Sequence, residues 1–212
     1  MKRNIMLVLG ILVFITTCSS CKNSGLSSEN SAIRAEAMKA AAAEISYDDG
    51  LPEAQHSPWW DKPGGQLAVV FTPESYPAVL TKVRFLVGID GVPTAEFRVR
   101  VFGGSVSEGP DESRDLLGSE VRASAPFGNK WVEVDLSDRN ITITGGDFCV
   151  SMEWLTPAGD HGAKAQLLGA DYSKPDRRSW WKTDSTSPWV RIEDVANVGD
   201  RDLMIRATIA KK

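Results

Sequence analysis

The amino-acid sequence predicts an all-β protein built around a single antiparallel β-sandwich. From Tyr47 onward, short apolar runs are separated by clusters of Gly, Pro, Asp and Asn, which is typical of strands joined by turns. Several of these runs alternate apolar with other residues, as in Phe97-Arg98-Val99-Arg100-Val101, so that one face of the strand is buried. No helical pattern of comparable length follows residue 45, and the remaining stretch of about 165 residues is long enough for one core.

The first 20 residues are predicted to be a secretory signal. Lys2 and Arg3 form a charged start, Ile5 to Ile15 form a short apolar stretch, and small polar residues follow. An apolar stretch of about 11 residues falls short of the roughly 20 that a membrane-spanning helix requires. We therefore expect this segment to be removed after export.

Cys21 follows Ser19-Ser20, and this junction resembles the lipobox of bacterial lipoproteins. The resemblance implies that the Cys21 thiol is lipidated, with palmitate among the acyl chains, and that the lipid anchors the protein to a membrane of the cell envelope. In a Gram-negative cell the outer membrane is the expected place. Cys18 is the alternative lipidation site, and a plain secretory signal with a secreted product is the alternative to lipidation.

Residues 21–45 are predicted to be a tether followed by a short helix. Lys22 to Ser31 are mainly polar, which is typical of a flexible linker. Ala32 to Glu44 consists almost entirely of strong helix formers. The domain organisation is then a signal peptide (1–20), a tether with a short helix (21–45) and a β-sandwich domain (46–212).

Strands of the sandwich are predicted wherever a short apolar run lies between turn signals. The expected strands are Leu67 to Phe71, Val79 to Val87, Glu96 to Phe102, Trp131 to Leu136, Ile141 to Ile143, Phe148 to Trp154, Ala165 to Leu168, Trp189 to Ile192 and Asp202 to Ile209. Cys149 lies within one of these strands, and we expect it to be a small buried apolar residue.

The charge and the residue types disfavour several classes of function. The formal net charge is −4, with no dense cluster of Lys and Arg, which disfavours nucleic acid as a partner. The two histidines, His56 and His161, belong to no zinc-binding motif. Gly103 to Gly109 does not have the spacing of a nucleophile elbow and is interpreted as a flexible loop. A pair of catalytic carboxylates, as in a polysaccharide hydrolase, remains open.

The seven tryptophans include two adjacent pairs, Trp59-Trp60 and Trp180-Trp181. Adjacent residues of a strand point to opposite faces, so one ring of each pair could face outward. An exposed indole can stack on a sugar ring or anchor a protein partner. These four residues are therefore candidate ligand-binding residues, with core packing as the alternative, whereas Trp131 and Trp154 are expected to be core.

Several aspartates suggest a structural calcium ion. Asp48, Asp49 and Asp171 are the candidate ligands, with Asp61 and Asp176 nearby in the sequence pattern. Calcium binds several carboxylate and carbonyl oxygens, often from loops. Asp-Asp-Gly is also an ordinary turn, so the absence of any metal is the alternative.

The order of landmarks along the chain resembles a known group of modules. The landmarks are Tyr47–Gly50, Ala68–Pro73, Val83–Phe85, Phe97–Val101, Trp131–Leu136, Gly146–Val150 and Arg178–Trp180. They resemble the jelly-roll or β-sandwich accessory modules that accompany the catalytic domains of secreted bacterial proteases and occur on other envelope proteins. The resemblance implies a jelly-roll-like fold and a location outside the cytoplasm.

The function predicted from the sequence is that of a non-enzymatic binding or structural lipoprotein of the envelope, which presents loop surfaces to a protein or glycan partner. The alternative is a jelly-roll-type polysaccharide hydrolase that uses two loop carboxylates. The two hypotheses differ in geometry, because a glycosidase needs two carboxyl groups about 5 to 10 Å apart in a groove.

Overall fold

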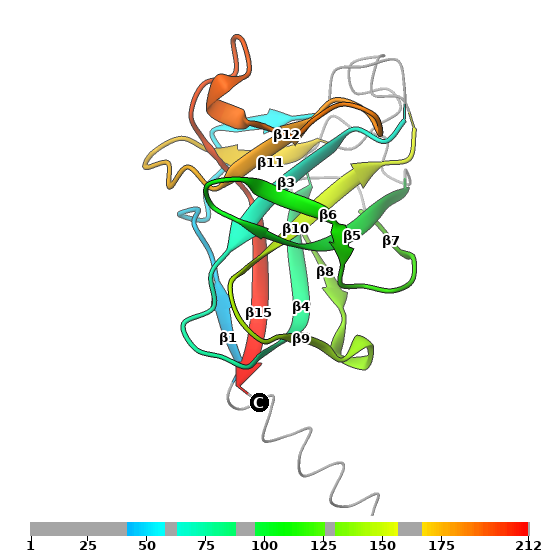
Figure 1. Cartoon of the computed structure of the whole chain (residues 1–212). Helices are drawn as coiled ribbons and strands as arrows, with labels where there is room; N and C mark the ends of the chain where they lie inside the picture. The colour runs from blue at the N-terminus through cyan, green and yellow to red at the C-terminus, as the bar shows by residue number, and fades with distance from the viewer. Residues whose placement is uncertain (1–41, 58–62, 88–95, 126–129, 157–166, 212) are drawn as a thin grey trace, which may run out of the picture. The chain divides into compact units, whose positions relative to one another are not determined.

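The residues that the structure describes form two antiparallel sheets (Figure 1). The computed structural model describes residues 42–57, 63–87, 96–125, 130–156 and 167–211, all of which belong to one structural unit. The only helices in these ranges are two short 3-10 helices, η1 (Ser137–Arg139) and η2 (Ile192–Asp194). The prediction of an all-β sandwich is confirmed.

The first sheet, sheet A, has eight strands in the order β1-β15-β4-β11-β14, with β2 paired to β11 and with β8 and β9 paired to β4. Its strands are β1 (Ala42–Ile45), β2 (Ala54–His56), β4 (Ala78–Val87), β8 (Lys130–Asp135), β9 (Ile141–Ile143), β11 (Leu168–Asp171), β14 (Asp202–Leu203) and β15 (Ile205–Lys211).

The second sheet, sheet B, has seven strands in the order β13-β12-β3-β10-β5-β6, with β7 paired to β5. Its strands are β3 (Gln66–Phe71), β5 (Glu96–Ser105), β6 (Gly109–Asp115), β7 (Val121–Ser124), β10 (Asp147–Trp154), β12 (Ser179–Lys182) and β13 (Val190–Arg191). The central strand β10 pairs with β3 on one side and with β5 on the other.

The main core lies between the sheets and is built by the alternation that the sequence shows. Fully burying one large apolar side chain contributes about 1.5–3 kcal/mol, so these residues dominate the stability of the fold. Phe71 stacks on Phe148 with ring centroids 5.4 Å apart, and Phe85 meets Phe97 edge to face at 5.3 Å. The fully buried large residues include Leu67, Leu80, Phe97, Leu136, Met152, Leu168, Ile192 and Leu203.

A hairpin formed by β5 and β6 folds over the outer face of sheet B, which is the face directed away from the main core. It encloses a second, small apolar cluster of Ala68, Val70, Phe102, Cys149 and Trp180. Its turn is tied to the far edge of the sheet, because Arg191 of β13 donates to the Val106 carbonyl at 2.6 Å. The interpretation of Gly103 to Gly109 as a flexible loop is therefore wrong, since this segment is the end of β5 and its ordered connection to β6.

The predicted helix over Ala32 to Glu44 is wrong at its C-terminal end. Ala42 to Ile45 form strand β1, which pairs with Ala207 to Ala210 of β15. Alanine favours a helix, but the open edge of β15 offers backbone partners that override this weak preference. Residues 1–41, which include Cys18 and Cys21, lie outside the described residues. Within the described ranges, no helix has the length and apolar character needed to span a membrane.

Candidate functional site

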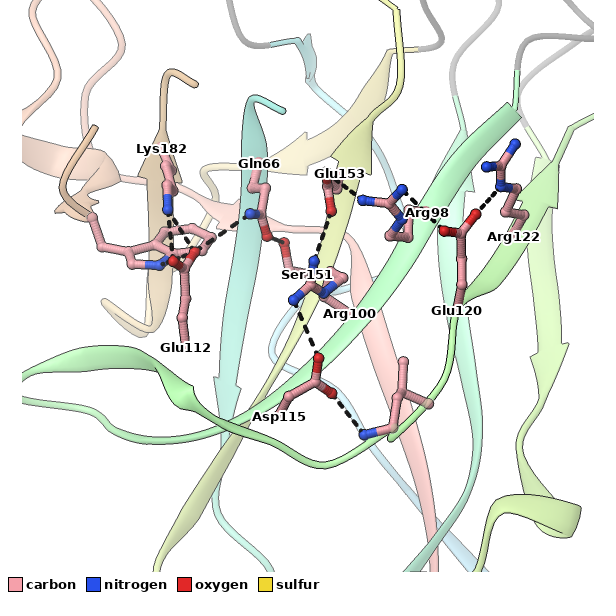
Figure 2. A network of polar contacts seen from close by, with 12 residues as sticks. Gln66, Arg98, Arg100, Glu112, Asp115, Glu120, Arg122, Ser151, Glu153 and Lys182 are labelled. Atoms are coloured by element: carbon pink, nitrogen blue, oxygen red, sulfur yellow. Dashed lines mark hydrogen bonds and ion pairs between the residues drawn. The ribbon is translucent and has the colours of Figure 1, made fainter. Parts of the chain in front are cut away.

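The outer face of sheet B carries a row of polar and charged side chains that crosses five strands (Figure 2). Strand register places these residues side by side in the order Lys182, Gln66, Glu153, Arg98 and Arg122, from β12 through β3, β10 and β5 to β7. Each strand sends alternate residues to this face, opposite to the apolar residues that fill the core. We call this row, with Arg100, Glu112 and Ser151 beside it, the polar face.

Glu153 lies at the centre of the polar face and is shared by two arginines. Arg98 Nη1 donates to Glu153 Oε1 at 2.9 Å, and Arg100 Nη1 donates to Glu153 Oε2 at 3.2 Å. Glu153 is only 7% exposed, and each of its two carboxylate oxygens accepts a hydrogen bond from one of these arginines. Ser151, which is fully buried, donates to Gln66 Oε1 at 3.0 Å and extends the network toward β3.

The same two arginines line a pocket of about 300 Å³ between β5 and the β6–β7 loop. Arg98 also pairs with Glu120 at 3.1 Å, and Arg100 pairs with Asp115 at 3.2 Å. The loop is braced at its start, because the Leu117 backbone amide donates to Asp115 Oδ1 at 2.9 Å. The pocket therefore has fixed donors and acceptors on its walls.

Glu112 belongs to strand β6, and its side chain reaches the Lys182 end of the polar face. Gly103 of β5 pairs with Asp111 of β6, whereas the adjacent Phe102 pairs with Asp115. Strand β6 therefore has three more residues than β5 at this point, and they form a bulge. A bulge bends its strand and redirects a side chain. Here it carries Glu112 over the sheet to Lys182 of β12, whose Nζ lies 2.6 and 2.8 Å from the two carboxylate oxygens.

The polar face is suited to binding through hydrogen bonds. Four of its members, Lys182, Gln66, Ser151 and Glu153, are buried and support the row from beneath. A ligand with many hydroxyl groups would therefore meet mainly Arg98, Arg100 and Arg122, whose side chains are 25%, 26% and 48% exposed. Glu112 and Glu153 are each held in ion pairs with cationic side chains. The hydrolase alternative remains a hypothesis.

Trp180 and Trp181 point to opposite faces of sheet B, as the sequence predicts, but neither ring is exposed. Trp181 joins the main core and is 2% exposed. Trp180 points outward and is 5% exposed, because the β5–β6 hairpin covers it and Arg191 lies 4.9 Å from its ring centroid. The expectation of an exposed outward-facing indole therefore fails for this pair. Trp59 and Trp60 lie outside the described residues.

The remaining tryptophans divide differently from the prediction. Trp154 is a core residue, as expected, and is 3% exposed. Trp131, which the sequence predicts to be core, is only partly buried. The guanidinium carbons of Arg84 and Arg206 lie 4.9 and 4.4 Å from the centroid of its ring. Trp189 was not singled out by sequence reasoning, yet its Nε1 donates to Glu112 at 3.1 Å at the polar face.

The predicted calcium ligands are only partly brought together. Asp49 and Asp171 lie close together, and Glu53 joins them, with ligand oxygens within 4.8 Å of one another. Asp48 is instead paired with Arg206, whose Nε donates to both of its carboxylate oxygens at 3.2 and 3.1 Å. Calcium binding at Asp49, Glu53 and Asp171 remains a prediction.

Two backbone amides donate hydrogen bonds to the Asp171 carboxylate and favour its ionised form. Burial acts to raise its pKa, but the amides of Asp49 and Ser173, at 2.8 and 2.7 Å, hold the pKa below its usual value. Asp202, its cross-strand partner, behaves in the opposite way. Burial raises the pKa of Asp202 to about 7, and nearby aspartates add to this effect.

Cys149 is fully buried in the small cluster beneath the hairpin, as expected of a small apolar residue. Burial raises the pKa of its thiol, and the neighbouring Asp147 acts in the same direction. A thiol in this state is a poor nucleophile, so Cys149 is a packing residue.

Comparison with known proteins shows similarity at the level of the fold. No family model matches the chain, and no curated protein has a significantly similar sequence. A solved structure of a variant of the clostridial cysteine protease Cwp84, after propeptide cleavage, is similar, with a TM-score of 0.61 and 11% sequence identity. The match covers 82% of this chain and 41% of that chain.

A second similar structure contains the cysteine protease and lectin-like domains of Cwp84, a surface layer associated protein of Clostridium difficile. It has a TM-score of 0.50 and 12% identity, and the match covers 71% of this chain and 32% of that one. This chain therefore spans less than half the length of either structure. The likeness supports the resemblance to an accessory module of a secreted bacterial protease at the level of fold.

Proposed function

We propose that the protein is a non-enzymatic binding module of the bacterial envelope that holds a glycan on the polar face of sheet B. The observation that carries this proposal is the continuous row from Lys182 to Arg122, with the adjoining pocket lined by Arg98 and Arg100. Polar groups in such a row have fixed positions because each is bonded to its neighbours. Sugars are recognised by such sets of directed hydrogen bonds.

The comparisons support this proposal through a shared scaffold. One of the similar structures contains a lectin-like domain of a surface layer associated protein, so a comparable sandwich occurs beside a protease at a cell surface. A scaffold does not determine function, and the argument for glycan binding therefore rests on the polar face. Lipidation at Cys21, predicted from the sequence, would hold the module at a membrane of the envelope.

The proposal is tested with the full chain and purified bacterial cell-wall polysaccharide, first by co-sedimentation and then by calorimetric titration with its soluble fragments. We expect Arg100→Ala to weaken binding by about tenfold or more, because a hydrogen bond from a charged group is worth about 1.5–3 kcal/mol. Lys82→Ala is the matched control, since it removes a cation paired with Glu133 at 2.7 Å on sheet A.

The result that would contradict the proposal is equal binding by wild type and the Arg100→Ala protein, or a loss of binding of similar size in Lys82→Ala. Melting temperatures of the two variants show whether each remains folded. The proposal would also be contradicted if the folded wild-type protein bound none of the polysaccharides tested.

A further inference from the structure

The Glu112 carboxylate lies in a small receptor made by three other residues. Lys182 Nζ contacts both of its oxygens, at 2.6 and 2.8 Å, and Trp189 Nε1 donates to Oε1 at 3.1 Å. Gln66 Nε2 donates to the same oxygen at a longer distance of 3.4 Å. An ammonium, an indole N–H and an amide N–H thus converge on one carboxylate, as they would in a site that binds an anion.

Two of the donors of this receptor, Lys182 and Gln66, lie on buried strands of sheet B, whereas the carboxylate comes from a peripheral strand. Lys182 and Gln66 are each 4% exposed and lie on the paired strands β12 and β3. The Glu112 side chain is 39% exposed and comes from the bulge of β6, at the other edge of the sheet. Gln66 accepts from Ser151, and the backbone of Lys182 is paired with β3, so these two donors would stay on sheet B if the Glu112 side chain moved away.

A buried ammonium group also requires an anionic partner. Removing the carboxylate that pairs with an almost fully buried lysine leaves an uncompensated charge, which is strongly unfavourable. Displacement of Glu112 is therefore favourable only if the incoming group is itself an anion that accepts the same hydrogen bonds. A neutral sugar hydroxyl does not satisfy this condition, whereas the carboxylate of an acidic sugar does.

From this geometry we infer that Lys182, Trp189 and Gln66 form a carboxylate subsite that takes a uronic acid residue of the bound glycan, with Glu112 occupying the subsite in the absence of ligand. This inference rests on the proposed function, because it adds a subsite to the same polar face. The row continues from Gln66 to Glu153 and Arg98, so the rest of the glycan would lie along it toward the Arg98–Arg100 pocket.

The test uses the full chain and two matched probes, D-glucuronate and D-glucose, with the indole resonance of Trp189 observed by NMR. Glucuronate is expected to shift this resonance in the wild-type protein, and glucose is not. In Glu112→Ala the subsite is free, so we expect about tenfold tighter binding of glucuronate than in wild type, because the protein's own carboxylate no longer competes. Glu112→Gln keeps the side-chain volume and is expected to act in the same direction.

Two further variants complete the design. Lys182→Met in the Glu112→Ala background is expected to abolish the response, and Glu133→Ala, which removes an exposed carboxylate paired with Lys82 on sheet A, is expected to behave as wild type. The inference is overturned if glucuronate binds wild type and both Glu112 variants equally, or if the response survives the loss of Lys182. In either case cell-wall polysaccharide binding that depends on Arg100 would leave the proposed function standing.

Discussion

At the scale of single residues, the two adjacent tryptophans of β12 show how burial changes the meaning of a sequence pattern. Opposite orientation follows from strand geometry, and the structure has it. Exposure does not follow, because it depends on the hairpin that covers Trp180. The sequence shows alternation within a strand, but it does not show which distant segment covers the outer face.

Replacing either ring by alanine should therefore destabilise the protein strongly. We expect Trp181→Ala and Trp180→Ala each to lower the free energy of unfolding by about 3–5 kcal/mol, as for other large aromatic residues removed from a core. Tyr172→Ala is the control, since Tyr172 is 51% exposed, and it should change the stability much less. Urea denaturation measures all three. A loss for Trp180→Ala as small as that of the control would mean that the hairpin does not bury this ring.

The buried carboxyl group of Asp202 makes a prediction about pH. Its pKa is raised to about 7, whereas an unfolded aspartate titrates near 3.9, so the folded state retains a proton that the unfolded state releases. This contribution to stability is present at low pH and is lost as the pH rises toward 7.

Asp202→Asn should remove that loss, because the amide does not ionise. Relative to wild type, the variant should gain stability between about pH 4 and pH 8, by at most about 4 kcal/mol. Chemical denaturation of both proteins across this range gives the difference, in which the other titrating groups cancel. A difference that does not vary with pH would show that Asp202 titrates normally.

At the scale of elements, the predicted strands with strong apolar alternation are present, whereas the sequence did not predict β1, β2, β6, β7 and β12. Ile141–Ile143 matches its prediction, and β4, β8 and β10 differ from theirs by one residue at each affected end. Strand β6, with the sequence Gly-Pro-Asp-Glu-Ser-Arg-Asp, has no apolar alternation to reveal it. It forms because β5 extends past Phe102 and offers it a partner, which is a tertiary effect.

The candidate site was missed for the same reason. The apolar alternation of both runs indicates that Arg98, Arg100, Ser151 and Glu153 face away from the core, but it does not show that the two strands are neighbours or that Ser151 and Glu153 are buried. The polar face appears only when the register of five strands is known. Glu112 could not have been placed at all, because it reaches Lys182 across three intervening strands of the sheet.

The hairpin formed by β5 and β6 should be sensitive to a single added methyl group. Gly109 has a φ of +83°, and a Cβ there would lie 2.8 Å from the Trp180 ring. We expect Gly109→Ala to destabilise the protein by about 2–4 kcal/mol, from backbone strain and overpacking together. Gly118→Ala, with a φ of +66° and open space around it, measures the backbone cost alone. Equal effects of the two substitutions in thermal unfolding would rule out close packing of the hairpin on Trp180.

At the scale of the whole molecule, the two faces of sheet B differ in character. The inner face supplies the main apolar core, and the outer face carries both the small cluster beneath the hairpin and the polar network. Under the proposed function, substitutions in the polar network would alter binding without removing contacts of the main core. The sheet remains a rigid support because β10 is paired on both sides.

Attachment to the envelope is predicted from the signal and Cys21. A lipidated protein should partition into the membrane fraction of the producing cells and incorporate labelled palmitate, since several acyl chains hold a protein firmly. Cys21→Ala should abolish both properties. A Cys21→Ala protein that still incorporates palmitate would instead point to Cys18.

The central claim, that the polar face of sheet B holds a glycan, is tested most directly by NMR of the isotope-labelled full chain titrated with soluble fragments of bacterial cell-wall polysaccharide. The account predicts that the shifted signals cluster on the polar face, at Gln66, Arg98, Arg100, Ser151, Glu153 and Lys182, with signals from Lys82 and Glu133 on sheet A unchanged. Shifts confined to sheet A, or a polar face that responds to none of the fragments, would contradict it.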